Sequence, residues 1–212
     1  MNEPGGLRTL KKERTRQAIA DAAIGLFLAN GFDQVSVAEI AAAAEVSKPT
    51  LFRYFASKEE LVLHRIADHR GEAGRVVRER PADVLALEAL QRHYLDRLAE
   101  RDAATGLCPA PEVLAFHRLV FETPSLSSHL LDYIAADTDA LAEALAETVD
   151  GADDLTSRLL AAQFLAVRQT LARANWARLA AGQPLPEAAR LAVADALTAF
   201  TLLRDGASGC GY

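Results

Sequence analysis

The sequence is poor in cysteine and has no long apolar run. Its 212 residues include two cysteines, Cys108 and Cys210, which lie far apart and lack the spacing of a metal site. This usage predicts no disulfide framework and is typical of a reducing compartment. No apolar run approaches the roughly 20 residues that span a bilayer, and the N-terminus lacks the apolar core of a secretory signal. We therefore expect a cytoplasmic protein without a membrane partner.

Motifs of the common catalytic centres are also missing. The chain has no H-E-x-x-H, no paired E-x-x-H of a di-iron bundle, no phosphate loop and no nucleophile elbow. Cys108 is followed by a proline and has no histidine close to it in the sequence that would activate it. We therefore expect that the chain is not an enzyme and that it uses no cofactor and no metal.

The alternation of β-branched residues that marks strands is absent, although half of the residues are apolar. The eight prolines and twelve glycines gather mostly at the ends of segments with helical spacing. A chain of this length can form one large or two small domains with cores of their own. We therefore expect an all-α fold.

Charge is divided unevenly along the chain, whose formal net charge is −6. Residues 1–58 hold eight Lys and Arg against six Asp and Glu, while the remainder holds 15 against 23. A mildly basic N-terminal segment on an acidic remainder favours a protein that contacts DNA at one end and repels it elsewhere. Several of the cations surround the start of the first predicted helix, where they oppose the helix dipole. Either this segment lies against DNA phosphates, or it is a solvated helix end.

Three serines between residues 36 and 60 each precede a predicted helix. Ser36 is followed three residues later by Glu39, which is the spacing of a capping box, and Ser57 begins a second S-x-x-E box. Ser47 precedes Pro49, a residue that the first turn of a helix tolerates. The predicted helices cover residues 36–44, 47–54 and 57 to about 80.

The first two of these helices have the pattern of a helix-turn-helix. Their apolar residues are spaced to pack together, and the second helix presents polar residues of the types that contact phosphates and base edges. Lys48 and Arg53 are expected to contact base edges. Contacts with the DNA phosphate backbone are expected from Ser36, Thr50, Tyr54 and Lys58. The alternative is an ordinary helical hairpin with a solvated face. The candidate DNA-binding residues are Ser36, Ser47, Lys48, Pro49, Thr50, Arg53, Tyr54 and Lys58.

The run SVAEIAAAAEVSKPTLFRYFASKEEL resembles the DNA-binding signature of TetR-family regulators, with its IA pair, VS at the turn, TL-aromatic-x-YF run and SKEEL. The preceding run RQAIADAAIGLFLANGFDQVSV is similar to that family's first helix and its Gly-Phe exit. The resemblance implies an N-terminal three-helix DNA-binding domain and a C-terminal helical domain for ligand binding and dimerisation. It also implies a repressor that binds an inverted-repeat operator as a dimer and is released by a small molecule.

Two positions depart from the family pattern. Phe52 stands where a tyrosine is usual, so we expect no phenol contact to phosphate and a ring that only packs. Glu45 stands where a turn glycine is common, and a left-handed conformation there costs about 1 kcal/mol for a residue other than glycine.

The predicted domain organisation follows from these motifs and from the glycines and prolines. A continuous connecting helix is expected to end at Pro81, with Gly71 and Gly74 weakening its middle. The predicted divisions are a disordered tail over 1–9, a helix-turn-helix DNA-binding domain over 10–56, a connecting helix over 57–80, a ligand-binding and dimerisation domain over 81–205, and a disordered tail over 206–212.

The last two predicted helices, 154–181 and 186–204, have more apolar surface than one core needs, with alanines between the large residues. We expect them to form a four-helix interface in a homodimer, with Leu171, Leu197 and Phe200 as contacts. The alternative is that one subunit buries all of this surface internally.

A small-molecule site in the C-terminal domain is expected where polar groups lie on apolar helix faces. Each polar residue of this kind has an alternative role as a member of a structural pair or as a dimer contact. The run FHRLVFETPSLSSHLL resembles effector domains of TetR regulators that respond to acyl-CoA-like molecules, so such a molecule or another hydrophobic ligand is the expected effector. A helical small-molecule-binding protein without DNA-binding activity is the alternative function. The candidate ligand-binding residues are Tyr94, His117, Phe121, Tyr133, Phe164 and Arg168.

Overall fold

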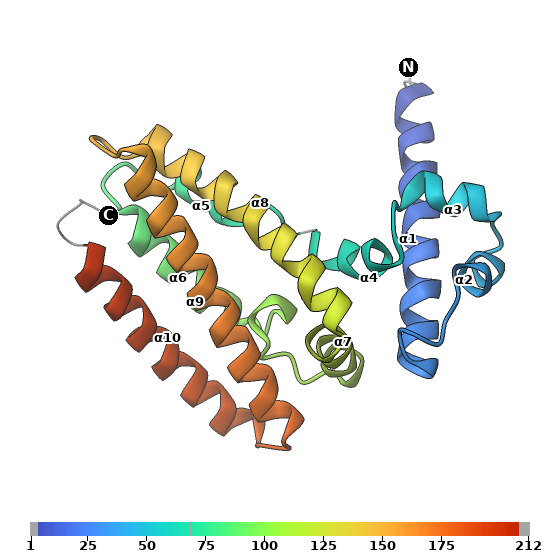
Figure 1. The fold of residues 1–212 in the computed structure, drawn as a ribbon. Helices are drawn as coiled ribbons and strands as arrows, with labels where there is room; N and C mark the ends of the chain where they lie inside the picture. Colours follow the sequence, from blue (N-terminus) through green and yellow to red (C-terminus); the bar gives the residue numbers. More distant parts are fainter. Residues whose placement is uncertain (1–3, 68, 208–212) are drawn as a thin grey trace. The chain divides into compact units, whose positions relative to one another are not determined.

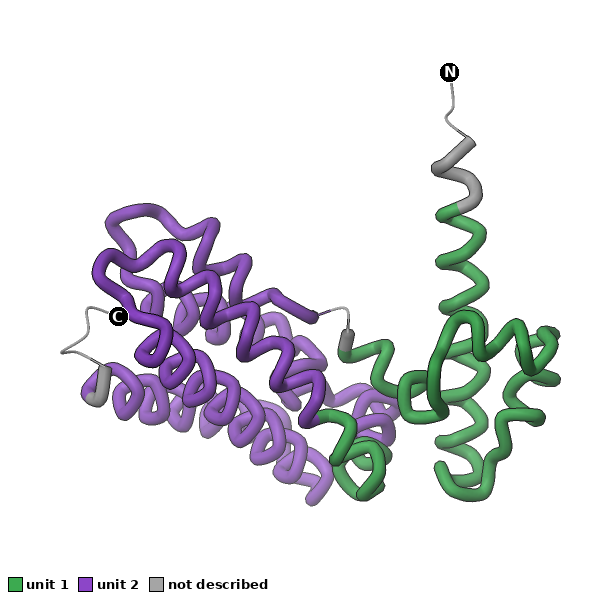
Figure 2. The backbone as a smooth tube through the Cα atoms, turned by 45° about the horizontal axis from the view of Figure 1, so that its top comes forward, with its two compact units in different colours: residues 1–68, 118–130 green, residues 69–117, 131–212 purple. Residues whose placement is uncertain are grey.

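The computed structural model describes residues 4–67 and 69–207, and within these ranges the chain is helical and has no strand (Figure 1). The prediction of an all-α fold is therefore confirmed. The chain forms two compact units, which Figure 2 distinguishes by colour. The head unit comprises residues 1–68 and 118–130, and the body unit comprises residues 69–117 and 131–212. None of the described helices combines the length and apolar character needed to cross a bilayer.

Four helices begin the head unit: α1 Pro4–Asn30, α2 Val37–Ala43, α3 Lys48–Tyr54 and α4 Lys58–Ala67. Ser36 and Ser47 occupy the N-cap positions of α2 and α3, as the sequence predicted. Apolar side chains from three helices close the core of this unit. Ile19, Phe27, Ile40, Leu51 and Phe55 are all at most 1% exposed. Burying side chains of this size contributes roughly 1.5 to 3 kcal/mol each.

The turn between α2 and α3 contains a residue in the left-handed conformation. Glu45 has φ of 53°, at the position where the sequence comparison anticipated a glycine. The Val46 amide donates to the Ala41 carbonyl at 2.9 Å, which closes the turn behind α2. The anticipated strain at this position is therefore present in the fold.

The first helix begins earlier than the sequence predicted. The expected disordered tail over residues 1–9 is wrong from residue 4 onward, because α1 begins at Pro4. Proline is compatible with the first turn of a helix, since its missing N–H would have no intrahelical partner there. Residues 1–3 lie outside the described part of the chain.

The body unit contains most of the remaining helices. Its helix α5 spans Glu72–Glu79, α6 spans Ala86–Ala99, and the 3₁₀ helix η1 spans Ala103–Thr105. Helices α7, Pro111–Glu122, and α8, Pro124–Thr148, each contribute residues to both units, because residues 118–130 belong to the head unit. The long helices α9, Asp154–Ala180, and α10, Leu185–Ala207, complete the body. The predicted tail over 206–212 is wrong for residues 206 and 207, and residues 208–212 lie outside the described part.

The predicted continuous helix over residues 57–80 is interrupted. Helix α4 ends at Ala67, α5 begins at Glu72, and Gly71 between them has φ of 69°. Glycine adopts this left-handed conformation without the steric cost that other residues meet. The Gly71 amide donates to Oδ1 of Asp137 on α8 at 2.9 Å, so the break is supported by a contact with a residue distant in the sequence.

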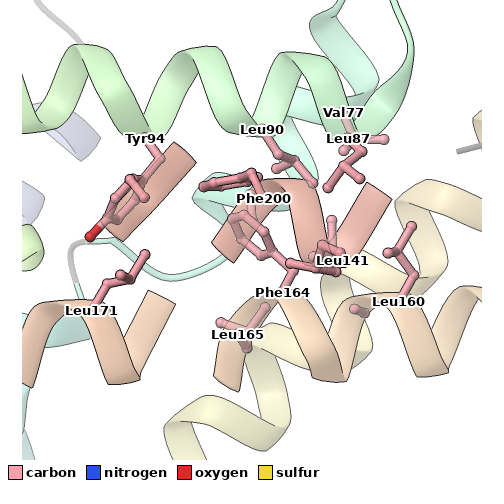
Figure 3. Close-up of a cluster of buried hydrophobic side chains, with 14 of the residues drawn as sticks. Val77, Leu87, Leu90, Tyr94, Leu141, Leu160, Phe164, Leu165, Leu171 and Phe200 are labelled. Carbon is pink, nitrogen blue, oxygen red and sulfur yellow. The ribbon is translucent and has the colours of Figure 1, made fainter. Parts of the chain in front are cut away.

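The body core joins helices α5, α6, α8, α9 and α10. Figure 3 labels ten of its side chains, and these come from the five helices. The ring centroid of Phe200 lies 5.9 Å from that of Tyr94 and 6.1 Å from that of Phe164. Phe200 is 1% exposed and Leu171 is 6% exposed. Both side chains, which were predicted as dimer contacts, are therefore buried within a single chain.

A cluster of charged side chains surrounds the first turn of α5. A carboxylate oxygen of Glu72 lies 3.4 Å from Nδ1 of His69, and the other lies 3.2 Å from Nε2 of His93 and 3.7 Å from the guanidinium of Arg97. The hydrogen bond with His69 is the main reason that the pKa of Glu72 is lowered to about 2. The same contact raises the pKa of His69. The two groups therefore stabilise each other while Glu72 is ionised and His69 is protonated.

Replacing Glu45 by glycine should stabilise the protein. The substitution removes a left-handed strain of about 1 kcal/mol, partly offset by the larger freedom of glycine in the unfolded chain. We expect the free energy of unfolding to rise by roughly 0.5 kcal/mol, measured by urea denaturation. Glu13→Gly, at an exposed position inside α1, is the control and should destabilise the protein; a Glu45→Gly variant destabilised to a similar extent would contradict the strain.

The stabilising effect of Glu72 should depend on pH in a defined way. The folded pKa of Glu72 is lowered, so its contribution is present above the unfolded value of about 4.5 and is lost as pH falls toward 2. The folded pKa of His69 is raised, so its contribution is complete below about 6.5 and is lost as pH rises through the folded value.

Accordingly, Glu72→Gln should destabilise the protein most between pH 4.5 and 6.5, by roughly 2 kcal/mol, and less on either side of this window. Urea denaturation across the pH range measures the difference from the wild type. Glu100→Gln is the control, because Glu100 is exposed and lies 3.5 Å from the same Arg97. A Glu72→Gln effect that does not vary with pH would show that the pair is not ionised as described.

Candidate nucleic-acid interface and body cavity

Helix α3 is held so that one face is buried and the opposite face is accessible. Its N-cap, Ser47, accepts a hydrogen bond from the Thr50 amide at 3.2 Å, and the two hydroxyl oxygens lie 2.8 Å apart. Leu51 is fully buried, whereas Lys48, Pro49 and Arg53 are exposed. The predicted base-reading cations therefore lie on the accessible face of the helix.

Ser36 takes part in a complete capping box at the start of α2. Its hydroxyl accepts from the Glu39 amide at 3.2 Å, and its own amide donates to the Glu39 carboxylate at 2.7 Å. This amide donor is the main cause of a lowered pKa at Glu39. Ser36 remains exposed, so its hydroxyl proton is accessible to a second acceptor such as a phosphate oxygen.

Arg53 and Tyr54 form a pair at the C-terminal end of α3. The guanidinium carbon of Arg53 lies 5.5 Å from the centroid of the Tyr54 ring. Tyr54 is partly exposed, while Phe55 after it is buried. A cation and a phenol hydroxyl are thus available together at this end of the helix, and both groups donate hydrogen bonds to phosphates or base edges.

Lys58 is oriented differently from the prediction. Its ammonium donates to the carbonyl of Phe32 and lies 4.3 Å from the centroid of the Phe32 ring. It also lies 5.4 Å from the centroid of Phe27. This cation therefore secures the end of α1 and the following loop against the start of α4. In this arrangement it does not extend toward a phosphate, and the sequence carried no sign of this long-range contact.

Phe52 also differs from the prediction. The side chain was expected only to pack, but it is 50% exposed. Leu51 and Phe55 already supply the buried face of α3. Phe52 stands in the sequence between the buried Leu51 and the exposed Arg53. Because Pro49 and Phe52 are three residues apart on one helix, they lie next to each other on its surface. The accessible face of α3 thus contains an apolar patch between two cations.

The candidate ligand-binding residues divide into two groups. Tyr94, Phe164 and Arg168 line one cavity of about 30 Å³ in the body unit. His117, Phe121 and Tyr133 do not line it, and Phe121 belongs to the head unit. His93 and Arg97, on the same predicted helix as Tyr94, also line it. The other lining residues were not predicted, because their side chains converge only after α5, α6 and η1 pack together. They are Glu72, Ala73, Asp102, Ala104 and Thr105.

The cavity combines apolar walls with ion pairs. Nη2 of Arg168 lies 3.2 Å from Asp137, and Nη2 of Arg97 lies 2.7 Å from Asp102. Burial raises the pKa of the Tyr94 hydroxyl above its ordinary value. The volume of the cavity is well below the roughly 300 Å³ of a typical small-molecule pocket, so a ligand of that size requires the cavity to expand.

His117 and Tyr133 lie outside this cavity. Burial lowers the pKa of His117, and the Tyr133 ring centroid lies 4.5 Å from the guanidinium carbon of Arg70.

Large apolar side chains are exposed on α9 and α10. Leu197, the third residue predicted for a dimer interface, is 44% exposed, in contrast to Leu171 and Phe200. Further exposed apolar residues on the two helices are Leu155, Leu159, Val193 and Leu202. The sequence correctly indicated excess apolar surface on these helices but did not identify which side chains carry it.

Comparison with known sequences gives a match in the region of the predicted motif. Residues 19–64 match the family model described as bacterial regulatory proteins, tetR family. The HTH-type transcriptional regulator TcmR of Streptomyces glaucescens is 36% identical over 173 residues, which cover 79% of this chain and 76% of TcmR. A match of this length includes residues of both the head and the body.

Solved structures show the same fold at lower sequence identity. NalD, the secondary repressor of the MexAB-OprM multidrug efflux pump in Pseudomonas aeruginosa, has a TM-score of 0.59 at 18% identity and covers 89% of this chain and 96% of its own. The regulator FadR from Bacillus subtilis, in complex with stearoyl-CoA, has a TM-score of 0.53 at 19% identity, with coverages of 88% and 96%. With the capped helix-turn-helix and the similarity to TcmR, the chain belongs to the TetR family of bacterial transcriptional regulators.

Proposed function

We propose that this regulator is a repressor that binds an inverted-repeat DNA operator as a homodimer and leaves it when a small molecule binds to the body. The observation that carries the proposal is the accessible face of α3, where Lys48, Pro49 and Arg53 are exposed around a fully buried Leu51. A cation-bearing helix anchored through its opposite side is the arrangement with which helix-turn-helix proteins enter the major groove.

The roles of the individual residues follow from their chemistry. Lys48 and Arg53 donate to acceptors on guanine edges, and the apolar patch of Pro49 and Phe52 fits a thymine methyl group. Ser36, Ser47, Thr50 and Tyr54 donate to phosphates through their hydroxyls and fix the orientation of the helix. Lys58 is excluded from the contact set because its ammonium is directed at Phe32. At seven residues, α3 is about 10 Å long and so contacts only a few base pairs in each half-site.

The homodimer is proposed from the exposed apolar surface of α9 and α10. Leu159, Val193 and Leu197 are each more than 40% exposed, and the two helices are neighbours in the body. A second copy of the same helices would cover these side chains in a symmetric four-helix contact. Such a dimer presents two α3 helices, which is what an inverted repeat with half-sites about one helical turn apart requires.

The effector is proposed to bind in the body cavity lined by Tyr94, Phe164 and Arg168. Because FadR is described in complex with stearoyl-CoA, an acyl-CoA-like or other hydrophobic molecule is the proposed ligand class. Binding would alter the α4–α5 connection and thereby separate the two heads. The coupling is reciprocal, so a ligand that weakens operator binding must itself bind more weakly to the operator complex, by the same factor. Mass spectrometry of small molecules retained by the purified protein would identify the ligand.

Arg53→Ala should weaken operator binding and relax the base preference at one position. Losing a base-reading guanidinium costs about 1 to 3 kcal/mol, which corresponds to roughly 5- to 150-fold in the dissociation constant. The probe is a duplex selected from a random library by the wild-type protein, with affinity measured by fluorescence anisotropy. Arg92→Ala, an exposed substitution in α6, is the matched control. If Arg53→Ala binds as tightly as this control, α3 is not the reading helix.

Leu197→Glu should produce a monomer with weak operator binding. The side chain is 44% exposed, so a charge there leaves the core intact and acts on the contact with a second copy. Sedimentation velocity gives the oligomeric state, and circular dichroism confirms the helical content. Leu131→Glu is the control, because Leu131 is 59% exposed but lies on α8. A Leu197→Glu variant that remains dimeric would place the interface elsewhere.

A further inference from the structure

The turn between α4 and α5 is held by two carboxylates of the body unit. The Gly71 amide donates to Oδ1 of Asp137 at 2.9 Å. Glu72, the next residue, contacts His69 on the other side of the turn at 3.4 Å. Since Gly71 has a left-handed φ of 69°, the local backbone does not continue either helix. The Glu72 amide donates to the His69 carbonyl at 3.2 Å, and the two carboxylates add to this backbone contact.

Both carboxylates are paired with cations that line the body cavity. Oδ2 of Asp137 lies 3.2 Å from Nη2 of Arg168, and Arg168 is a lining residue. Glu72 itself lines the cavity, as do its neighbours His93 and Arg97. Every link from the cavity to the turn is therefore a direct contact between named atoms. Glu72 contacts the turn directly, whereas the second link runs from Arg168 through Asp137 to Gly71.

Asp137 contacts the turn and Arg168 at the same time. Its side chain is 14% exposed and that of Arg168 is 25% exposed, so both charges are largely removed from water. A ligand oxygen that accepts hydrogen bonds from Arg168 competes directly with Asp137 for the guanidinium. A largely buried carboxylate that loses its cation is destabilised by desolvation and moves toward water. That movement withdraws the acceptor from the Gly71 amide.

We propose that Asp137 is the positioning residue through which occupation of the cavity loosens the α4–α5 turn. The proposal rests on the proposed function, because the turn is the point in the chain where the body unit follows α4 of the head. With Asp137 engaged, the turn is fixed and the operator-binding state is favoured. With Asp137 released, the turn keeps the Glu72 cluster and the hydrogen bond from the Glu72 amide to the His69 carbonyl but loses its contact with α8. The population then shifts toward the state with low operator affinity.

The chain contains a matched control for this link. Asp139, two residues further along α8, lies 2.9 Å from Nη1 of Arg158, which is on α9 like Arg168. This second α8–α9 ion pair is exposed, at 69% and 54% for the two side chains, and neither residue contacts the turn. Removing it tests the loss of an ion pair between the same two helices without the loss of the contact to Gly71.

The first measurement is amide hydrogen exchange of the free protein, followed at Gly71 by NMR. Asp137→Ala removes the acceptor and should accelerate exchange roughly tenfold. Arg168→Gln should accelerate it severalfold, because Asp137 loses its cation. Asp139→Ala and Arg158→Gln should leave the rate unchanged. In Asp137→Asn the amide oxygen can still accept from Gly71, so exchange should be slower than in Asp137→Ala; equal rates in these two variants would overturn the contact.

The second measurement is affinity for the selected operator duplex. Asp137→Ala and Arg168→Gln should weaken binding by at least threefold without changing the oligomeric state, whereas the two control variants should bind like the wild type. Accelerated exchange at Gly71 with unchanged operator affinity would overturn the regulatory role of Asp137. The exchange measurement needs no DNA, so a failure to select any duplex would refute the proposed function and leave the contact itself separately tested.

Discussion

The burial of Leu51 and Phe55 in the core of the head is the interaction that sets the position of α3. Both side chains are at most 1% exposed, and they fix the rotation of a helix only seven residues long. An isolated helix of this length is not stable in water, so tertiary packing supplies its stability and its orientation. The same packing leaves Lys48 and Arg53 on the accessible side, where contact with DNA is chemically possible.

The body is organised around a second constraint, the pairing of partly buried charges near the start of α5. Two carboxylates contact cations that line the cavity, those of Glu72 and Asp137. The pKa of Glu72 is about 2, and Asp137 accepts a hydrogen bond from the Gly71 amide. An apolar core alone would give this region stability but no polar connection between cavity and turn. Charges in such positions are costly to bury unless they are paired, and both carboxylates have a cationic partner here.

Features set by local chemistry could be predicted from the sequence, and those set by distant contacts could not. The caps at Ser36 and Ser47 depend on residues three positions away, and both were predicted correctly. The direction of Lys58 depends on a carbonyl 26 residues away, and the break at Gly71 on a carboxylate 66 residues away. The alanine-rich helices α9 and α10 are apolar on several sides, so the sequence did not reveal that Phe200 lies inside the body.

Hydrogen exchange with and without the selected duplex, analysed by mass spectrometry, shows directly whether α3 contacts DNA. DNA should slow exchange in peptides covering residues 47–54, while peptides from the buried part of α9 around Phe164 should be unaffected. A duplex that binds tightly, protects the body and leaves residues 47–54 unprotected would contradict this expectation, because α3 would then lie outside the DNA interface.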